Sequence, residues 1–524
     1  MKSPKSSNDK KPRSLNKSNK GIVYLIGGGP GSPDLITVKA KECLHKADVI
    51  VYDYLIDESL LSLGGKDAEL LYVGKKSGQH TMSQQEINKL LIAKAEQGLA
   101  VARLKGGDPF IFGRGGEEAM ELAEAGIQFE IVPGVTSAVA VPAYAGIPLT
   151  HRDHSSTVCF ITGHEDPTKE TSNINWDSLA QSPGTLVFLM GIGNLGNITR
   201  KLIHSGRPAH SPVAVISNGT TPNQKTVTGT LENIEQKAKD ANLTPPGVIV
   251  VGDVVGLRGH LNWFETRPLF GKNILVTRPE DQAAGFVSIL SGLGARCVQI
   301  PAIRIMPPTT WKELDRAIAG LSVYDWILFT SINGVKYFFG RLQVFKKDAR
   351  HLSGIKIGVI GPKTAQALLD RGVIPDLIPD KYSAEGIVEA LHQYPLTGQR
   401  VLLPRPVIAR DYLPEELKTL RAKVDVVEAY QTVQPEYDQN QLDDLFKKGA
   451  IDMVTFTSSS TVDNFLGLFE GKSVGKEISK ILVACIGPIT ARRATEKGLT
   501  VTVVPDEYTG DALARAIVEF YQTL

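Results

Sequence analysis

The sequence has few cysteines and no long apolar run. Its four cysteines, Cys43, Cys159, Cys297 and Cys485, lie more than a hundred residues apart, and no pair has the spacing of a zinc site or a disulfide framework. No apolar run approaches the roughly 18 residues that a membrane span needs, and the N-terminus lacks the apolar core of a secretory signal. These absences predict a cytoplasmic protein without a membrane segment.

Excess charge of either sign is also lacking, because 58 Lys+Arg and 56 Asp+Glu give a net charge of +2. Seven basic residues and Asp9 give residues 1–20 a charge of +6, which leaves the rest near −4. A nucleic-acid surface needs basic residues clustered on a folded face, so we expect no nucleic-acid partner. We expect residues 1–20 to form a disordered basic tail rather than a transit peptide.

The 524 residues predict several domains. From Gly21 onward, short β-branched runs such as IVYLIG and DVIVYD alternate with helical stretches, which is the pattern of βαβ units. A second series of such runs follows Pro133. The pattern predicts an α/β domain with lobes at about 21–133 and 134–264, followed by a linker at 265–271.

Residues 272–524 contain an internal duplication. Four landmarks recur in the same order, 126 or 127 residues further along the chain. They are ILVTRP and VLLPRP (274–279 and 401–406), FTS (329–331 and 456–458), Gly-Pro (361–362 and 487–488) and Pro-Asp-x-Tyr (379–382 and 505–508). We expect two similar α/β lobes that face each other across a cleft, with the repeated motifs at the C-terminal ends of the strands, where such sheets bind ligands.

A glycine cluster follows the first expected strand, in YLIGGGPGSPDLIT. It imitates a dinucleotide fingerprint, but Ser32 stands where the third glycine belongs, and Pro30 and Pro33 would break the start of the helix. The pattern therefore favours a loop that lets a different ligand approach the backbone. Further glycine-rich turns occur in RLKGGDPFIFGRGGEE (103–118) and VPGVTSA (132–138), and such loops are often functional.

With these motifs, the segment 22–262 resembles the uroporphyrinogen-III C-methyltransferases of the tetrapyrrole methylase family, and RLKGGDPFIFGRGG is the most specific part of the match. The resemblance implies a fold of two α/β lobes that hold S-adenosylmethionine between them. It also implies methylation of uroporphyrinogen III at C-2 and C-7 to give precorrin-2, and a homodimer formed through this half.

The resemblance also assigns site residues. Asp53 matches the family's proton acceptor and Lys75 its proton donor, although without the resemblance they would be taken for a helix cap and a surface lysine. The acid that usually follows GPG in the family is Ser32 here, which puts the role of that carboxylate in doubt. The positions that match cofactor contacts are Pro30, Gly106, Gly107, Asp108, Ile111, Thr136, Ser137, Met190 and Gly219.

The chemistry agrees with these residue types. A sulfonium methyl group is already activated, so alignment is the main contribution of the protein, and proton transfer is the other. Because the substrate carries many carboxylates, Arg114, His151 and Arg152 are candidate clamps, although solvation explains each equally well. His151, His154 and His164 lack a metal-ligand spacing, so we expect no metal.

The segment 272–524 resembles uroporphyrinogen-III synthase through VTRP, FTS, IGPxTA and EAYQTV. The resemblance implies a duplicated, two-lobed α/β fold that closes hydroxymethylbilane into uroporphyrinogen III with inversion of ring D and without a cofactor. Tyr430 matches a tyrosine that assists loss of the substrate hydroxyl, and it could instead be a partly buried tyrosine bonded to the backbone. Ile489 stands where the family often has Thr. Residues expected to line the cleft and bind carboxylates are Ser331, Thr364, Ser458 and Thr490.

The two halves fit one reaction sequence, because the product of the second would be the substrate of the first. We therefore expect a bifunctional enzyme of tetrapyrrole biosynthesis. Two alternatives remain open. The first half could methylate a later corrin intermediate, or the second half could only bind a tetrapyrrole.

Overall fold

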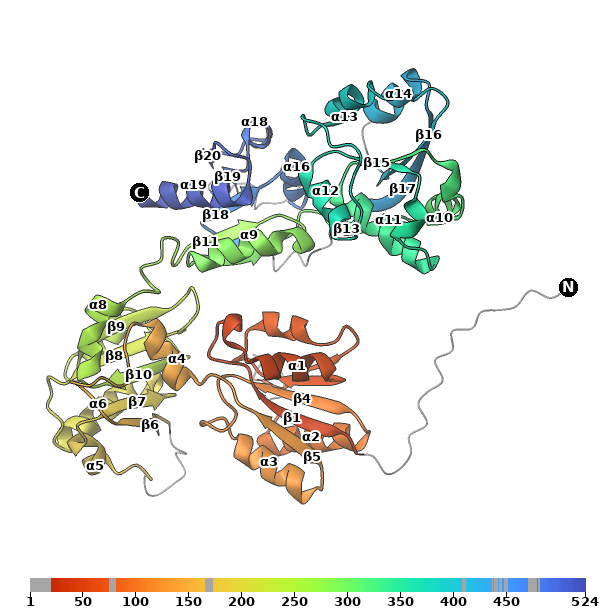
Figure 1. The fold of residues 1–524 in the computed structure, drawn as a ribbon. Coiled ribbons are helices and arrows are strands. Elements are labelled where there is room, and N and C mark those ends of the chain that lie inside the picture. The colour runs from red at the N-terminus through yellow and green to blue at the C-terminus, as the bar shows by residue number, and fades with distance from the viewer. Residues whose placement is uncertain are drawn as a thin grey trace. The chain divides into compact units, whose positions relative to one another are not determined.

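A computed structural model describes residues 20–74, 82–164, 173–407, 411–435, 437, 442, 445–446, 451–469, 478 and 481–524. The chain divides into two compact units, the first made of Met1–Lys272 with Leu293–Arg296 and the second of Asn273–Gly292 with Cys297–Leu524. In the described residues, each unit contains two five-stranded sheets (Figure 1). No helix of the described residues is long and apolar enough to cross a membrane.

The first lobe is a parallel sheet with the strand order β3-β2-β4-β1-β5. Strand residues alternate between its faces, so Leu25 and Val51 pack with α2 and α3, whereas Ile26 and Ile50 pack with α1. Burial on both faces explains why these strands read as continuous apolar runs. The elements are β1 (Ile22–Gly27), α1 (Val38–Lys46), β2 (Val49–Tyr52), β3 (Glu69–Tyr72), α2 (Gln84–Glu96), β4 (Ala100–Lys105), α3 (Gly115–Glu124) and β5 (Gln128–Val132).

The second lobe has a mixed sheet with the order β6-β7-β10-β8-β9, in which only β6 and β7 are parallel. It therefore departs from a purely βαβ arrangement, and β9 (Lys225–Thr230) lies outside the predicted runs. Helix α4 packs on one face of the sheet through Ala138 and Val141. The elements are α4 (Ser137–Tyr144), β6 (Val158–Thr162), α5 (Trp176–Gln181), β7 (Thr185–Leu189), α6 (Leu195–His204), β8 (Pro212–Ser217), β9 (Lys225–Thr230), α7 (Ile234–Asp240), β10 (Gly247–Val251) and α8 (Arg258–Leu261).

The segment predicted as a linker, residues 265–271, packs against the protein. Glu265 accepts hydrogen bonds from the Gln224 side chain at 2.8 Å and from the Thr226 hydroxyl, and it forms an ion pair with Arg258. Leu269 is fully buried. Side-chain contacts therefore hold this segment in place, so it is not a free tether.

Residues 273–524 form two lobes, and each combines strands from both copies of the duplication. Strand β11 of the first copy pairs with β18 of the second, and β16 of the second pairs with β14 of the first. The sheet orders are β12-β11-β18-β19-β20 and β13-β17-β16-β14-β15. The strands are β11 (Asn273–Val276), β12 (Arg296–Gln299), β13 (Arg304–Met306), β14 (Trp326–Phe329), β15 (Lys356–Val359), β16 (Arg400–Pro406), β17 (Lys423–Val433), β18 (Met453–Phe456), β19 (Leu482–Cys485) and β20 (Val501–Val503).

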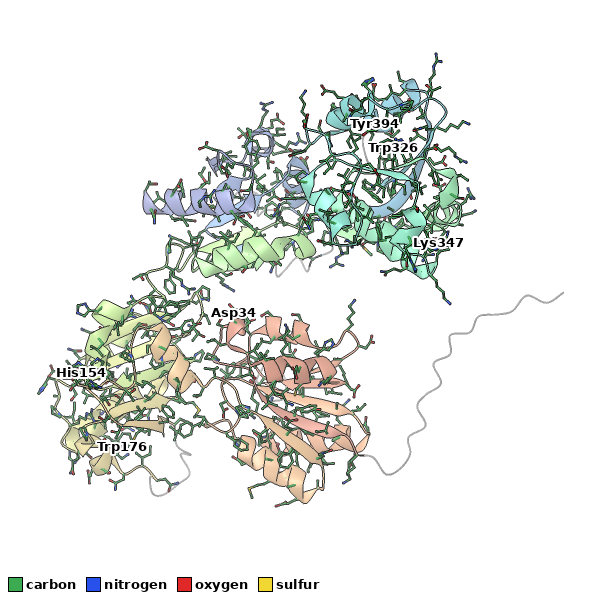
Figure 2. All side chains as sticks on the ribbon, in the orientation of Figure 1. Asp34, His154, Trp176, Trp326, Lys347 and Tyr394 are labelled. Carbon is green, nitrogen blue, oxygen red and sulfur yellow. The ribbon has the colours of Figure 1, made fainter. Side chains whose placement is uncertain are left out.

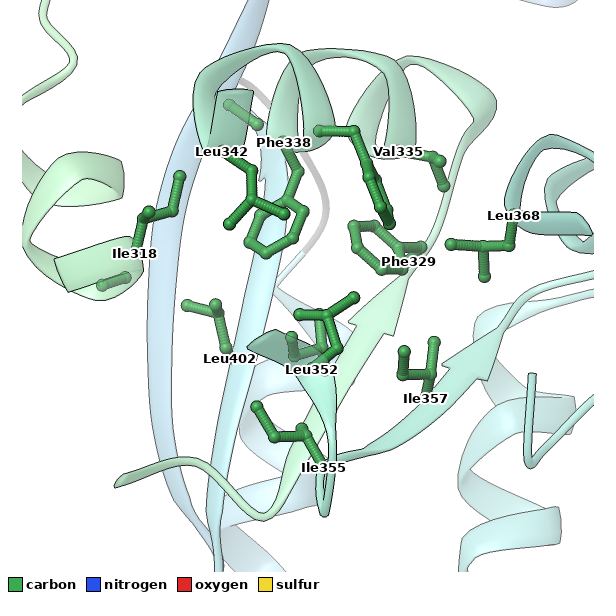
Figure 3. Packing of buried hydrophobic residues seen from close by; sticks show 14 of the residues in the cluster. Ile318, Phe329, Val335, Phe338, Leu342, Leu352, Ile355, Ile357, Leu368 and Leu402 are labelled. Atoms are coloured by element: carbon green, nitrogen blue, oxygen red, sulfur yellow. The ribbon is translucent and has the colours of Figure 1, made fainter. Parts of the chain in front are cut away.

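Helices cover these sheets with apolar side chains. In the lobe built on β14, Phe329 on that strand meets Phe338 on α11 edge to face, with ring centroids 5.4 Å apart (Figure 3). Leu402 and Ile357 from the neighbouring strands complete this layer. Described helices of this unit are α9 (Glu280–Gly292), α10 (Lys312–Ala319), α11 (Ile332–Val344), α12 (Pro362–Leu369), α13 (Ala384–Leu391), α14 (Tyr412–Thr419), α16 (Ser459–Gly467), α18 (Pro488–Glu496) and α19 (Gly510–Gln522).

Candidate active sites

Three glycine-containing loops of the first lobe meet backbone to backbone at the C-terminal edge of its sheet. Gly29 and Gly107 exchange backbone hydrogen bonds of 3.2 and 2.6 Å. A Cβ added to Gly134 would lie 2.2 Å from the Gly107 carbonyl oxygen, and one added to Gly27 would lie 2.5 Å from the Cα of Gly134. Only glycine fits such an approach, so the loops after β1, β4 and β5 form one cradle. Predicted cofactor residues Pro30, Gly106 and Gly107 lie in it.

Polar side chains fix this cradle. The Asp108 carboxylate accepts hydrogen bonds from the backbone N–H of Phe110 at 2.8 Å and of Gly134 at 3.0 Å, which ties the loop after β4 to the loop after β5. Thr136 caps α4 by accepting from Ala138 N–H, and Ser137 is the first residue of that helix. The structure thus brings the predicted residues Asp108, Thr136 and Ser137 to the same edge as the glycine loops.

The second lobe contributes the loop after β8. Thr220 accepts a hydrogen bond from the Ser32 backbone N–H at 3.0 Å, so this loop meets the loop after β1. Its neighbour Gly219 is buried against Val141, which a Cβ would approach to 2.4 Å. Gly219 is therefore joined to the cradle through Thr220. Met190 follows β7 with 52% of its surface exposed, and Ile111 is 37% exposed.

Asp53, the predicted proton acceptor, follows β2 directly. Its carboxylate accepts a hydrogen bond from the Leu55 backbone N–H at 3.2 Å and forms an ion pair of 3.2 Å with Arg103 on the neighbouring strand β4. The Asp53 side chain is 21% exposed, whereas that of Arg103 is only 3% exposed. A Cβ on Gly106 would lie 2.7 Å from the Leu55 side chain. The loop that carries Asp53 therefore touches the loop that carries the predicted cofactor residues.

Behind Asp53 lies a buried charge network that the sequence analysis missed. Glu118 on α3, fully buried, pairs with Lys105 at 2.7 Å and with Arg103 at 3.4 Å, and it accepts a hydrogen bond from Gln84 at 3.0 Å. Burial is the largest influence on Lys105 and lowers its pKa. Among the described residues, the second carboxylate oxygen of Glu118 has no hydrogen-bond partner. Arg and Lys at alternate positions of an apolar strand were the signal that could have revealed this network.

Arg114, His151 and Arg152, also predicted for the methylase half, form none of the ion pairs of this network. Lys75 falls outside the described residues. Arg114 pairs with Glu117 at 2.7 Å on the exposed start of α3. His151 accepts a hydrogen bond from the backbone N–H of Asp153, and Arg152 is exposed.

The histidine rings also lie at the surface of the second lobe. His151 and His154 have ring centroids 4.8 Å apart, and His154 lies on that lobe in Figure 2. The described residues contain no group of three or more potential ligands placed to hold a metal ion.

In the second unit, Tyr430 on β17 meets Ser331 after β14. Their hydroxyl oxygens are 2.9 Å apart, although the two residues are 99 positions apart in the chain. Tyr430 is 6% exposed and stacks on Tyr337. Burial raises the pKa of Tyr430, and the hydrogen bond with Ser331 partly opposes this. A neutral phenol able to donate a proton is therefore the resting form, and its partner is a side-chain hydroxyl rather than the backbone.

The remaining predicted residues of this unit lie at helix N-termini. Ser331 caps α11 and Ser458 caps α16, each by accepting a backbone N–H of the first turn. Thr364 in α12 and Thr490 in α18 are buried to 4% and 5% exposure. Ile489 is 75% exposed, so the position where the family often has Thr presents an apolar side chain to solvent. Helix N-termini favour anions, which suits carboxylates.

Both units match known families. Residues 22–235 match the model of the tetrapyrrole (corrin/porphyrin) methylases, and residues 285–515 match that of uroporphyrinogen-III synthase HemD. A porphyrin biosynthesis protein HemD from Ruminiclostridium josui is 39% identical over 95% of this chain and 98% of its own. A uroporphyrinogen-III C-methyltransferase from Bacillus subtilis is 42% identical over 71% of this chain and 76% of its own.

A third relative covers the first half. The S-adenosyl-L-methionine-dependent uroporphyrinogen III methyltransferase of Methanosarcina barkeri is 53% identical over 46% of this chain and 94% of its own. Folds and families together define a two-part α/β enzyme of tetrapyrrole biosynthesis. The chain belongs to the family of porphyrin biosynthesis proteins in which a tetrapyrrole methylase is fused to a uroporphyrinogen-III synthase. This confirms the resemblances and the fold class given by the sequence.

Proposed function

We propose that the chain converts hydroxymethylbilane into uroporphyrinogen III, with inversion of ring D, and then methylates that product at C-2 and C-7 to give precorrin-2. The fusion itself carries this proposal, because family models match both halves and one relative spans nearly the whole chain. The domains would be a tail at 1–20, the methyltransferase at 21–264, a linker at 265–271 and the synthase at 272–524.

The cradle in the methylase half fits S-adenosylmethionine. Gly107 has a φ of +67°, and a Cβ there would find its nearest neighbour, Ser137 N, only at 3.8 Å, so space lies open beside it. Backbone groups at Pro30 and Gly106, with the hydroxyls of Thr136 and Ser137, would hold the polar parts of the cofactor. S-adenosylmethionine supplies an activated methyl group when bound. Ile111, Met190 and Gly219 would also contact the cofactor, and Asp108 would hold the loops of the cradle in place.

Asp53 would accept the proton that the ring system of the substrate loses after methyl transfer. Arg103 holds its carboxylate in one orientation, and the 21% exposure of Asp53 leaves a route to substrate. A positioned base of this kind contributes about 10² to 10⁴ in rate. Lys75 would donate a proton, and Arg114, His151 and Arg152 would bind substrate carboxylates.

In the synthase half, Tyr430 would donate its proton to the leaving hydroxyl of the linear substrate, with Ser331 orienting the phenol at 2.9 Å. Ser331, Thr364, Ser458 and Thr490 would bind carboxylates at the helix N-termini. We propose further that the enzyme is a homodimer formed through its methylase half, which analytical ultracentrifugation tests directly.

The decisive experiment supplies purified protein with hydroxymethylbilane, with and without S-adenosylmethionine, and analyses the products by mass and absorption. We expect the type III ring without the cofactor and a doubly methylated ring with it. Only the type I ring would mean spontaneous closure, so the second half would merely bind tetrapyrroles. Failure to methylate supplied uroporphyrinogen III would favour a methylase of a later corrin intermediate.

A further inference from the structure

Arg278 lies at the C-terminal edge of the sheet that contains β11 and β18. It follows β11 by two residues, and its Nε donates a hydrogen bond of 3.2 Å to the hydroxyl of Thr457, which follows β18. The side chain is half-buried, and Thr457 precedes Ser458, the cap of α16. The guanidinium therefore contacts Thr457 at the edge where the duplication repeats its hydroxyl motif.

No described carboxylate forms an ion pair with Arg278. Its equivalent in the second copy, Arg405, also has little exposure, at 14%, but pairs with Asp411 at 2.7 Å. Charged groups are rarely buried without a partner, because the loss of hydration is then uncompensated. Burial alone lowers the pKa of Arg278. The charge of Arg278 in the first copy is therefore not paired with a described carboxylate, whereas the charge of Arg405 in the second copy is paired with Asp411.

The neighbouring groups give this edge an anion preference. The N-terminus of α16 begins after Ser458, and that of α18 begins after Gly487 on the adjacent strand. Both helix ends carry partial positive charge, which adds to the charge on Arg278 instead of cancelling it. Among the side chains that the structure describes, none supplies an anion that offsets this charge.

We propose that Arg278 binds a carboxylate of the linear tetrapyrrole substrate through its two Nη groups, while Thr457 holds its Nε. This rests on the proposed synthase function, whose substrate is a polycarboxylate. A guanidinium binds a carboxylate with two parallel N–H···O bonds, so Arg278 fixes the orientation of one acid side chain at this lobe. Arg405 does not share the role, because Asp411 already occupies its guanidinium.

The test compares the ring-closure kinetics of the full chain with those of Arg278→Met and Arg405→Met. We expect Arg278→Met to raise KM about 10- to 100-fold with little change in kcat, since one charge-assisted contact to the substrate is lost. Arg405→Met should change KM less than about threefold. Arg278→Lys should restore part of the affinity, because it keeps the charge without the planar fork. Methylation of supplied uroporphyrinogen III shows whether the methylase half of each variant is folded. Urea unfolding shows whether its synthase half is folded.

A second variant, Thr457→Val, tests the proposal even if Arg278→Met fails to fold. Thr457→Val keeps the charge of Arg278 and removes only its anchor, so KM should rise by a smaller factor of about 3 to 10. The inference is overturned if Arg278→Met leaves KM within about twofold of the native value, lowers kcat alone, or matches Arg405→Met. A native chain that forms only the type I ring would instead overturn the proposed synthase function, and the role of Arg278 with it.

Discussion

The two halves build their candidate sites from different chemical groups. In the methylase half, Asp53 is held by Arg103, which belongs to a buried network with Glu118 and Lys105. In the synthase half, Tyr430 is held by the hydroxyl of Ser331. Charges fixed in a dry environment are already oriented before the reaction begins. Around Tyr430 the synthase half instead uses neutral hydroxyls, such as that of Ser331 at the N-terminus of α11, and its proposed cation, Arg278, lies on the other sheet.

The comparison is tested most strongly at Asp53. In Asp53→Asn the side chain keeps its size but cannot accept a proton, so we expect methylation of supplied uroporphyrinogen III to fall about 10²- to 10⁴-fold. Ring closure of hydroxymethylbilane should be unchanged, because it takes place in the other unit. Initial rates of both reactions on one preparation measure this. Methylation within about threefold of native would remove Asp53 from the proton-transfer role.

Glu118 tests the buried part of the network. Glu118→Ala would leave Arg103 and Lys105 buried without their shared carboxylate, and breaking such a pair costs about 3–5 kcal/mol. We expect urea unfolding of the methylase half to show a loss of that size. The matched control is Glu117→Ala, since the exposed pair of Glu117 with Arg114 contributes no more than about 1 kcal/mol. Equal stability of the two variants would contradict a structural role for the network.

How much of each half could be predicted from the sequence has physical causes. Apolar runs located the buried central strands, and glycine loops located the cradle, because burial and close backbone approach restrict residue type directly. The more exposed strands β3, β5 and β9 were not predicted. The same reasoning missed Arg103, Lys105 and Glu118, since their pairing depends on α3 lying over β4, and a pattern of residues along the chain does not contain that contact. Lys75 stays a prediction, as it lies outside the described residues.

The duplication shows a second limit. An offset of 127 residues identifies β11 and β16 as equivalent segments, but equivalence does not say which sheet each one joins. Because the two copies have similar strands, each strand could pair with a strand of either copy. In the structure, β11 pairs with β18 of the second copy, and β16 pairs with β14 of the first. For the same reason, Arg278 and Arg405 appear alike in the sequence, whereas in the structure Arg405 pairs with Asp411 and Arg278 bonds to Thr457.

Tyr430 provides the matching test in the synthase half. Tyr430→Phe removes the phenolic proton and leaves the ring stacked on Tyr337, so ring closure should slow by about 10²-fold, the low end of what a positioned acid contributes. The share of type I product should rise, because spontaneous closure then competes. Methylation of supplied uroporphyrinogen III should not change.

Ser331 shows whether the hydrogen bond itself matters. If Ser331 orients Tyr430, adding Ser331→Ala to Tyr430→Phe should cost less than the two single losses combined. Fully additive losses in ring-closure rate would mean that the two hydroxyls act separately. No change in either single variant would favour a second half that only binds tetrapyrroles.

The smallest expected effect concerns alkaline pH and one buried thiol of the synthase half. Burial raises the pKa of Cys485 on β19 from 9.0 to about 12. In the unfolded chain the thiol loses its proton near its ordinary pKa, whereas in the folded chain it keeps it, so between these values stability falls as pH rises. The slope is at most about 1.4 kcal/mol per pH unit for one group.

Urea unfolding of the synthase half between roughly pH 8 and pH 11 measures this slope. Cys485→Ala should make it shallower but not abolish it, because burial also raises the pKa of Cys297 in the same half. The matched Cys159→Ala in the methylase half should leave it unchanged. A residual decline should persist above about pH 10, because burial and Asp425 raise the pKa of Tyr324 to about 12. Identical slopes for the native chain and Cys485→Ala would mean that this thiol titrates alike in both states. In the methylase half, the pH dependence of stability has the opposite sign at Lys105. Because burial lowers the pKa of Lys105, stability rises with pH as that group titrates.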